Sequence, residues 1–170
     1  MSKVLIMDTS ILCVWLQIAG KATLGEGKDS WDYERVNQKI ETEIAAKTIL
    51  VLPLASIIET GNHIAQSSGN RYHLALSFAE LIRKTVNNET PWAAFTVQSD
   101  LWSAEKLNDL AEKWPRLAAN RLSLGDATIK DVAEYYAEQS STKVEIFTGD
   151  EGLKAYEPLV KPAFIPRRRK

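Results

Sequence analysis

Four acidic residues occupy positions from which their side chains could meet. Asp8 and Asp150 each stand at or just beyond the end of an apolar run. Glu59 lies early in a helix predicted to follow another such run, and Asp126 opens a predicted helix after Gly125. Because ligands of parallel α/β sheets sit outside the carboxyl ends of the strands, we expect these four side chains to gather at one edge of a sheet.

Gathered carboxylates repel one another, so some need a raised pKa unless a cation is present. Mg²⁺ and Mn²⁺ prefer oxygen ligands, and two such ions about 3.5–4 Å apart can activate a water and stabilise a leaving oxygen of a phosphodiester. Zinc fits less well, because His63, His73 and Cys13 show no ligand spacing.

Each acid taken alone also has a structural interpretation. Asp8 and Asp126 suit helix N-termini, and Asp150 in TGDEG suits a turn or a cap. Glu59 is harder to explain in this way, because Glu is seldom buried without a partner. Ser10 and Thr148 could orient the neighbouring acids or hold a metal-bound water, and their alternative role is capping.

Apolar runs and helical periodicity predict the elements that would position these side chains. We predict strands over residues 3–7, 49–54 and 144–147, with further short strands at 95–97 and 163–165. We predict helices over residues 11–19, 33–47, 55–66, 72–86, 100–113, 126–139 and 151–156. The expected helix caps are Thr9 or Ser10, Ser30 or Asp32, and Ser99, and Pro115 is expected to close the helix over 100–113. This alternation predicts an α/β fold with a mostly parallel sheet.

The length, the composition and the absent motifs limit which classes of protein the chain can belong to. The 170 residues suit one domain, predicted over 1–166 and followed by a basic tail at 167–170. The net charge of -1 gives no overall positive field for nucleic acid, so such binding would rest on a local patch. One cysteine, no spanning run and no export signal predict a cytoplasmic protein without a membrane partner. The phosphate-loop, dinucleotide and serine-hydrolase motifs are absent from the sequence.

The order MDTSIL, IIE, LGDATI and IFTGDEGL resembles the PIN domain family over nearly the whole chain. The resemblance implies a three-layer α/β/α sandwich and a Mg²⁺- or Mn²⁺-dependent ribonuclease. Such an enzyme cleaves single-stranded RNA by a metal-activated water and leaves a 5′-phosphate and a 3′-hydroxyl. The implied catalytic residues are Asp8, Glu59, Asp126 and Asp150, with Asp8, Asp126 and Asp150 as metal ligands and Ser10 and Thr148 in support. Many relatives are toxins with an antitoxin partner, and the family is often dimeric.

The chain differs from the smallest members of that family by two extra segments, at 20–39 and 90–117. The second segment carries Trp92, Trp102 and Trp114, which could form a partner surface, a base-stacking wall or core. These departures keep open a non-catalytic PIN-like scaffold within a larger complex. An adhesion-type metal site would need a serine where Leu12 stands, and a haloacid-dehalogenase-like phosphatase would need an aspartate in place of Ser10.

RNA binding would also require positive charge near the acids. The candidates are Lys21, Lys28, Arg71, Arg116, Arg121, Lys154 and the RRRK tail, among which we predict Arg71, Arg121 and Lys154 as substrate-binding residues. His63 lies one helical turn after Glu59 and could face the site, but we expect it to be an exposed helix residue.

Overall fold

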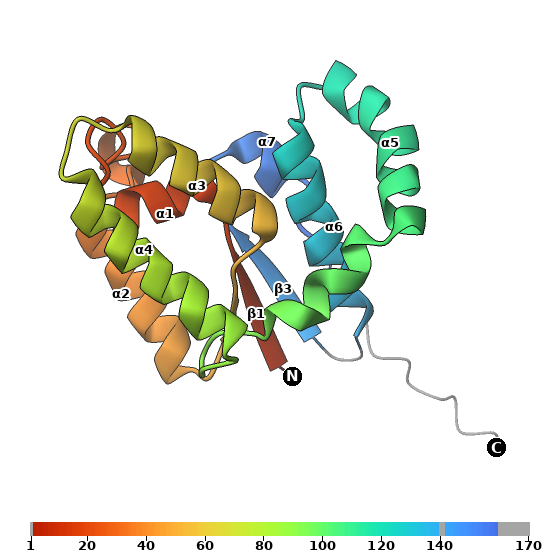
Figure 1. Ribbon diagram of the computed structural model, residues 1–170, viewed down its shortest axis with the longest axis horizontal. Helices are drawn as coiled ribbons and strands as arrows, with labels where there is room; N and C mark the ends of the chain where they lie inside the picture. The colour runs from red at the N-terminus through yellow and green to blue at the C-terminus, as the bar shows by residue number, and fades with distance from the viewer. Residues whose placement is uncertain (1, 140–141, 160–170) are drawn as a thin grey trace.

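The computed structural model describes residues 2–139 and 142–159, and at 95–97 it describes the backbone alone. The described residues form a three-layer α/β/α sandwich around a parallel sheet of three strands (Figure 1). The strands are β1 (Ser2–Met7), β2 (Ile49–Val51) and β3 (Thr142–Phe147), in the spatial order β2-β1-β3. Both neighbours of β1 run parallel to it, as the alternation of strands and helices predicts.

The central strand is apolar on both faces because helices cover both sides of the sheet. Val4 and Ile6 pack toward α6, whereas Leu5 and Met7 pack into the core beneath α1 and α2. Each of these four side chains is at most 2% exposed. Such a strand can be read from an unbroken apolar run, and the predicted strand over 3–7 is confirmed.

Helices of the first half of the chain cover one face of the sheet, and those of the second half cover the other (Figure 1). The first group is α1 (Thr9–Trp15), α2 (Tyr33–Ala45), α3 (Leu54–Gln66) and α4 (Arg71–Val86). The second group is α5 (Ala104–Ala119), α6 (Leu124–Glu138) and α7 (Glu151–Lys154). Two 3₁₀ helices, η1 (Gly27–Asp29) and η2 (Phe95–Trp102), lie in the connections. In the described part of the chain, no helix has the length and apolar character needed to cross a membrane.

The predicted strand at 95–97 is wrong, since this backbone belongs to η2. The outer edge of β2 is already met by the segment around Trp92. The Leu50 amide donates to the Pro91 carbonyl over 2.9 Å, and the Ala93 amide donates to the Leu50 carbonyl over 2.8 Å. Trp92 is buried in the hydrophobic core, which agrees with the core interpretation of this tryptophan.

The helix predicted over 100–113 is displaced along the chain. Ser103, rather than Ser99, accepts from the Lys106 amide and caps α5. Pro115 does not end this helix, which continues to Ala119. No α5 residue is buried, so water can reach the carbonyl that loses its amide partner at the proline. The predicted strand at 163–165 and the tail at 167–170 lie outside the described residues.

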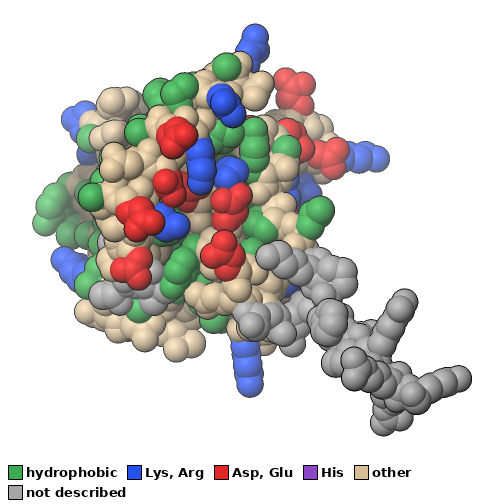
Figure 2. Space-filling view, turned by 90° about the vertical axis from the view of Figure 1, so that its right-hand side faces the viewer, with side chains coloured by type: hydrophobic (Ala, Val, Ile, Leu, Met, Phe, Trp, Pro, Cys, Tyr) green, Lys and Arg blue, Asp and Glu red, His purple; other side chains and the backbone are tan. Residues whose placement is uncertain are grey.

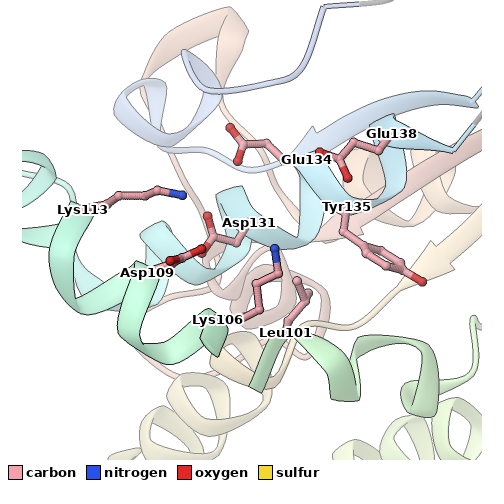
Figure 3. Close-up of a pocket in the computed structure, with 8 residues that line it drawn as sticks. All are labelled: Leu101, Lys106, Asp109, Lys113, Asp131, Glu134, Tyr135 and Glu138. Atoms are coloured by element: carbon pink, nitrogen blue, oxygen red, sulfur yellow. The ribbon is translucent and has the colours of Figure 1, made fainter. Parts of the chain in front are cut away.

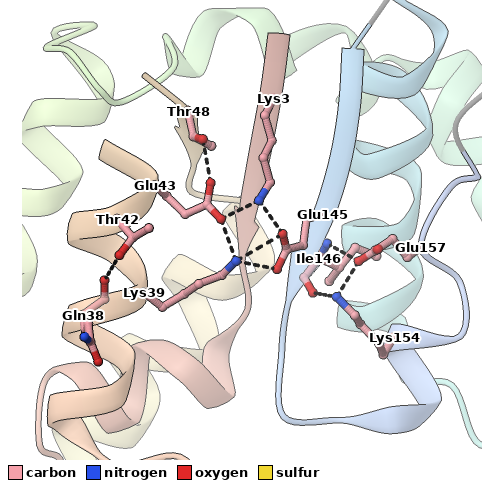
Figure 4. A network of polar contacts seen from close by, with 10 residues as sticks. All are labelled: Lys3, Gln38, Lys39, Thr42, Glu43, Thr48, Glu145, Ile146, Lys154 and Glu157. Atoms are coloured by element: carbon pink, nitrogen blue, oxygen red, sulfur yellow. Dashed lines mark hydrogen bonds and ion pairs between the residues drawn. The ribbon is translucent and has the colours of Figure 1, made fainter. Parts of the chain in front are cut away.

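A network of charged side chains joins α2 to the sheet, and the sequence did not reveal it (Figure 4). The ammonium groups of Lys3 and Lys39 both pair with the Glu43 and Glu145 carboxylates, with Lys39–Glu43 at 2.6 Å and Lys3–Glu145 at 2.7 Å. The Thr48 hydroxyl donates to Glu43 over 2.6 Å. Glu145 faces α2 because the adjacent Val144 and Ile146 face α6.

Candidate active site

The four predicted acids line one cavity of about 330 Å³ at the carboxyl edge of the sheet. The cavity is bounded by the chain after β1, the loop after α1, the middle of α3 and the first turn of α6. The lining residues that bear on chemistry are Asp8, Glu59, Asp126, Asp150, Lys21 and His63. The fold thus brings together residues from positions 8 to 150.

Asp8 directly follows β1 and is 4% exposed. Its Oδ2 atom accepts from the Ser10 hydroxyl over 2.5 Å, the Thr148 hydroxyl over 2.7 Å and the Ser10 amide over 3.2 Å. Asp8 therefore caps α1, which confirms its structural interpretation, and neither Thr9 nor Ser10 is the cap. Since three donors converge on Oδ2, the carboxylate is held in one orientation at the strand end.

Ser10 and Thr148 join the two loops that follow β1 and β3. Besides their bonds to Asp8, the Ser10 hydroxyl accepts from the Gly149 amide over 3.0 Å, and the Thr148 hydroxyl accepts from the Asp150 amide over 2.9 Å. These contacts fix the loop of one strand against that of its neighbour. Both side chains therefore orient carboxylates and also shape turns.

Asp126 and Asp150 also lie at helix N-termini, Asp126 in the first turn of α6 and Asp150 at the cap of α7. The Ser123 hydroxyl caps α6 by accepting from the Asp126 amide over 3.0 Å, and it donates to Asp126 Oδ2 over 2.8 Å. The helix therefore begins at Leu124, slightly before the predicted start at 126. Asp150 caps α7, because its Oδ1 accepts from the Gly152 amide over 2.7 Å and from the Leu153 amide over 3.3 Å.

Glu59 reaches the same cavity from α3. Its Oε2 accepts from the Thr9 hydroxyl over 3.1 Å. Its Oε1 lies only 2.1 Å from the point where a Cβ atom on Gly125 would stand. The carboxylate therefore occupies space that exists because residue 125 has no side chain, and it lies against the first turn of α6 beside Asp126.

The four carboxylates share one pattern. In each of them one oxygen accepts hydrogen bonds that fix the side chain, namely Oδ2 of Asp8 and Asp126, Oδ1 of Asp150 and Oε2 of Glu59. Within residues 2–139 and 142–159, no hydrogen bond reaches the second oxygen of any of the four. The capping role and the site role are therefore compatible, because they use different atoms of the same group.

The electrostatics of the cavity follow from burial and from this crowding. Burial raises the pKa of Glu59, the Thr9 hydrogen bond opposes that rise, and the charges of Asp126 and Asp8 add to it. Burial also raises the pKa of Asp126, against the Ser123 hydrogen bond and with the help of the charges of Asp8 and Asp150. The acids thus interact with one another across the cavity.

The basic residues are placed differently from the predictions. Arg71 and Arg121 are exposed and do not line the cavity. Lys154 is occupied elsewhere, because its ammonium donates to the Ile146 carbonyl over 2.8 Å and pairs with Glu157 at 2.6 Å (Figure 4). Among the Lys and Arg residues that the structure describes, Lys21 is the one that lines the cavity. The sequence offered it as one of several candidates without distinguishing it.

His63 was expected to be an exposed helix residue, and this expectation is wrong. Its ring is half-buried and lines the cavity one turn beyond Glu59. Burial lowers the pKa of His63, and the positive charge of Lys21 lowers it further. The position four residues after Glu59 was the signal in the sequence, since such residues share one face of a helix.

In the part of the chain that the structure describes, no three His, Cys, Asp or Glu side chains are grouped closely enough to hold a metal ion between them. The donor set still fits a hard divalent ion. Mg²⁺ typically takes one or two carboxylates and completes its shell with water and phosphate oxygens, so a closed cage of protein ligands is not required. Such an ion would bind to the carboxylate oxygens that accept no hydrogen bond, and its positive charge would offset the repulsion among the acids.

A second charged cavity, of about 160 Å³, lies between α5 and α6 (Figure 3). Lys106, Lys113 and Asp109 of α5 face Asp131 and Glu134 of α6 across it. The surface on the α5 side of the molecule mixes acidic and basic side chains (Figure 2). Because opposite charges alternate there, this face offers neither a uniform phosphate-binding surface nor a cluster of acids comparable to the one at the sheet edge.

Comparisons of the chain with models of protein families, with curated proteins and with solved structures found no match.

Proposed function

We propose that this protein is a metal-dependent nuclease of the PIN type that hydrolyses phosphodiester bonds of single-stranded RNA. One observation carries the proposal: four carboxylates from distant parts of the chain line one cavity, and each has one oxygen fixed by hydrogen bonds and one without such a partner. The cavity lies at the carboxyl edge of a parallel sheet, where α/β folds bind their ligands.

Asp8, Asp126 and Asp150 are the residues that would hold Mg²⁺ or Mn²⁺ through their unpaired oxygens. The ion would lower the pKa of a water and offset negative charge on the phosphate. Asp8 supports this role through its rigidity, since Ser10 and Thr148 hold its other oxygen. The buried strand β1 fixes the backbone beneath it.

Glu59 is the residue proposed to take the proton of the attacking water. Its pKa is raised by burial, and a base with a raised pKa holds a proton better at neutral pH. The water oxygen would bond to phosphorus while the bond from phosphorus to the 3′-oxygen breaks. That oxygen would leave as a 3′-hydroxyl after taking a proton from solvent water, and the phosphate would stay on the 5′ side.

The test is cleavage of labelled single-stranded RNA by the purified full chain, with Mg²⁺ or Mn²⁺ and with EDTA. Asp8→Asn and Asp126→Asn should each lower the rate by about 10²-fold or more, because each loses a charge placed at the reacting phosphate. Asp131→Asn is the matched control, since Asp131 lies on α6 like Asp126 but faces the other cavity. Metal-dependent cleavage that persists in both site variants would refute the site.

Absence of cleavage by the wild-type chain would favour the non-catalytic scaffold instead. A toxin role, an antitoxin or other protein partner, a homodimer and a cytoplasmic location remain predictions of the resemblance and the composition.

A further inference from the structure

We propose that Lys21 and His63 form the phosphate-binding wall of the acidic cavity and contact a backbone phosphate of single-stranded RNA. This inference rests on the proposed function, because it names the contact by which the substrate would be held there. It assigns a role to two side chains that the acid cluster leaves unexplained. Both line the cavity together with the four acids.

Four carboxylates alone would repel a polyanion, so the cavity requires a protein cation as well as metal. Lys21 is suited to this, because its ammonium makes no hydrogen bond or ion pair within the described residues. Lys154, by contrast, is already paired with Glu157. Of the basic candidates that lie within residues 2–139 and 142–159, Lys21 is the one that lines the cavity.

The backbone after α1 places Lys21 at this position. The Ile18 amide donates to the Cys13 carbonyl over 3.0 Å, and the Lys21 amide donates to the Ile18 carbonyl over 2.8 Å. Gly20 between them has a φ of 80°, a conformation that favours glycine. Ile18 is 1% exposed and anchors this turn in the core, so the start of the Lys21 side chain is fixed beside the cavity.

His63 reaches the same wall from a different element, α3. Both side chains line one cavity, where burial and the positive charge of Lys21 lower the pKa of His63. Within the described residues no hydrogen bond acts on the His63 ring, so a neutral imidazole can donate one N–H to a phosphate oxygen. The cavity therefore combines four carboxylates, which suit a metal ion, with two side chains that can donate to a phosphate.

The size of the cavity favours a single strand. A volume of about 330 Å³ lies at the low end of the roughly 300–1,000 Å³ range of ligand pockets. Such a space accepts one nucleotide unit of a flexible chain. A duplex presents its phosphates on a wide rigid cylinder, so we expect it to enter such a space less deeply than a flexible single strand.

The test measures equilibrium binding of a short fluorescein-labelled single-stranded RNA to the full chain, at several salt concentrations. Ca²⁺ replaces Mg²⁺, since it also takes oxygen ligands but in a looser geometry that disfavours turnover. Lys21→Gln should weaken binding about fivefold and reduce the slope of log K against log salt by about 0.7, the amount for one phosphate contact with a single strand. His63→Ala should weaken binding about twofold to threefold with little change of slope, because a neutral ring releases no counterion.

Lys28→Gln is the matched control, because Lys28 lies on the same loop but does not line the cavity. We expect it to change binding by less than about twofold. Equal losses for Lys21→Gln and Lys28→Gln would overturn the inference, as would absence of RNA binding by the wild-type chain. A DNA strand of the same sequence should show the same dependence on Lys21, because a phosphate contact does not read the 2′-hydroxyl; a loss confined to RNA would refute a phosphate contact.

Cleavage with Mg²⁺ separates this inference from the proposed function. In an active enzyme Lys21→Gln should raise KM about fivefold and leave kcat within about twofold, as expected for loss of uniform binding. If RNA is cleaved and Lys21→Gln and Lys28→Gln do not differ, the phosphate contact of Lys21 is refuted and the proposed nuclease function stands. If RNA is not cleaved but its binding depends on Lys21, the proposed nuclease function is refuted and the phosphate contact stands.

Discussion

Replacing Gly125 with alanine should damage the site without damaging the fold. A Cβ atom at this position would stand 2.1 Å from Glu59 Oε1, so the Glu59 carboxylate must move. The atom that is struck is the far end of a flexible side chain, which can rotate into the cavity at little cost. The backbone itself is helical and accepts alanine.

The expected change in stability follows from two opposing effects. Alanine in place of a helical glycine stabilises by about 0.5–1 kcal/mol. Loss of the hydrogen bond from Thr9 to Glu59 costs about 1 kcal/mol. The free energy of unfolding should therefore stay within about 1 kcal/mol of wild type, as measured by urea denaturation. Displacement of the proposed base by more than 1 Å should lower RNA cleavage by about 10- to 100-fold.

Gly61→Ala provides the control, because Gly61 lies in α3 and a Cβ there would meet no atom within 4 Å. It should stabilise the protein by about 0.5–1 kcal/mol and leave cleavage unchanged. Two results would refute the reasoning. Full activity of the Gly125→Ala variant would show that the observed position of Glu59 does not matter for cleavage. Destabilisation by more than about 2 kcal/mol would show that the carboxylate cannot move aside cheaply.

Three further outcomes are expected. Against the opposing effect of burial, pairing with Lys3 and Lys39 lowers the pKa of Glu43 to about 2. Glu43 therefore adds stability above its unfolded pKa of about 4.5, and this stability is lost as the pH falls toward 2. In denaturation experiments, Glu43→Gln should lower the free energy of unfolding by about 2 kcal/mol at pH 7 and by nearly nothing at pH 2. In NMR titration, His63 should show a midpoint below 6.5 that rises in Lys21→Gln, and an unchanged midpoint would contradict their proximity. Burial raises the pKa of Cys13 to about 11, so its thiol should resist alkylation at pH 8 until the chain unfolds; rapid labelling of folded protein would contradict this.

The sequence by itself predicted the α/β architecture and the ends of β1 and β3, whereas β2 ends at Val51 and not at the predicted residue 54. An unbroken apolar run predicted β1, because a strand covered by helices on both faces needs no polar side. The largely apolar segment 144–147, interrupted by Glu145, predicted β3. Asp8 and Asp150 could then be placed at the open edge, since each follows such a run. The N-cap of α2 at Asp32 was also predictable, because capping depends on a residue and the amides that directly follow it.

Local patterns failed where distant segments compete for the same place. Residues 95–97 have β-forming side chains, but the edge of β2 is taken by the chain around Trp92. Pro115 was read as a helix stop, although a proline on an exposed helix leaves a carbonyl that water can reach. The network around Glu43 was invisible, because its partners come from a strand and a helix far apart in the sequence.

The same division applies to the candidate site. Residue types and spacing identified the four acids, but only the tertiary structure decided which basic residue accompanies them. Lys21, Arg71 and Lys154 look alike in sequence as cations near loops or short helices. In the folded chain the first lines the cavity, the second lies outside it and the third pairs with Glu157. Long flexible side chains have weak local preferences, so their positions depend on which charges and surfaces the folded chain places within their reach.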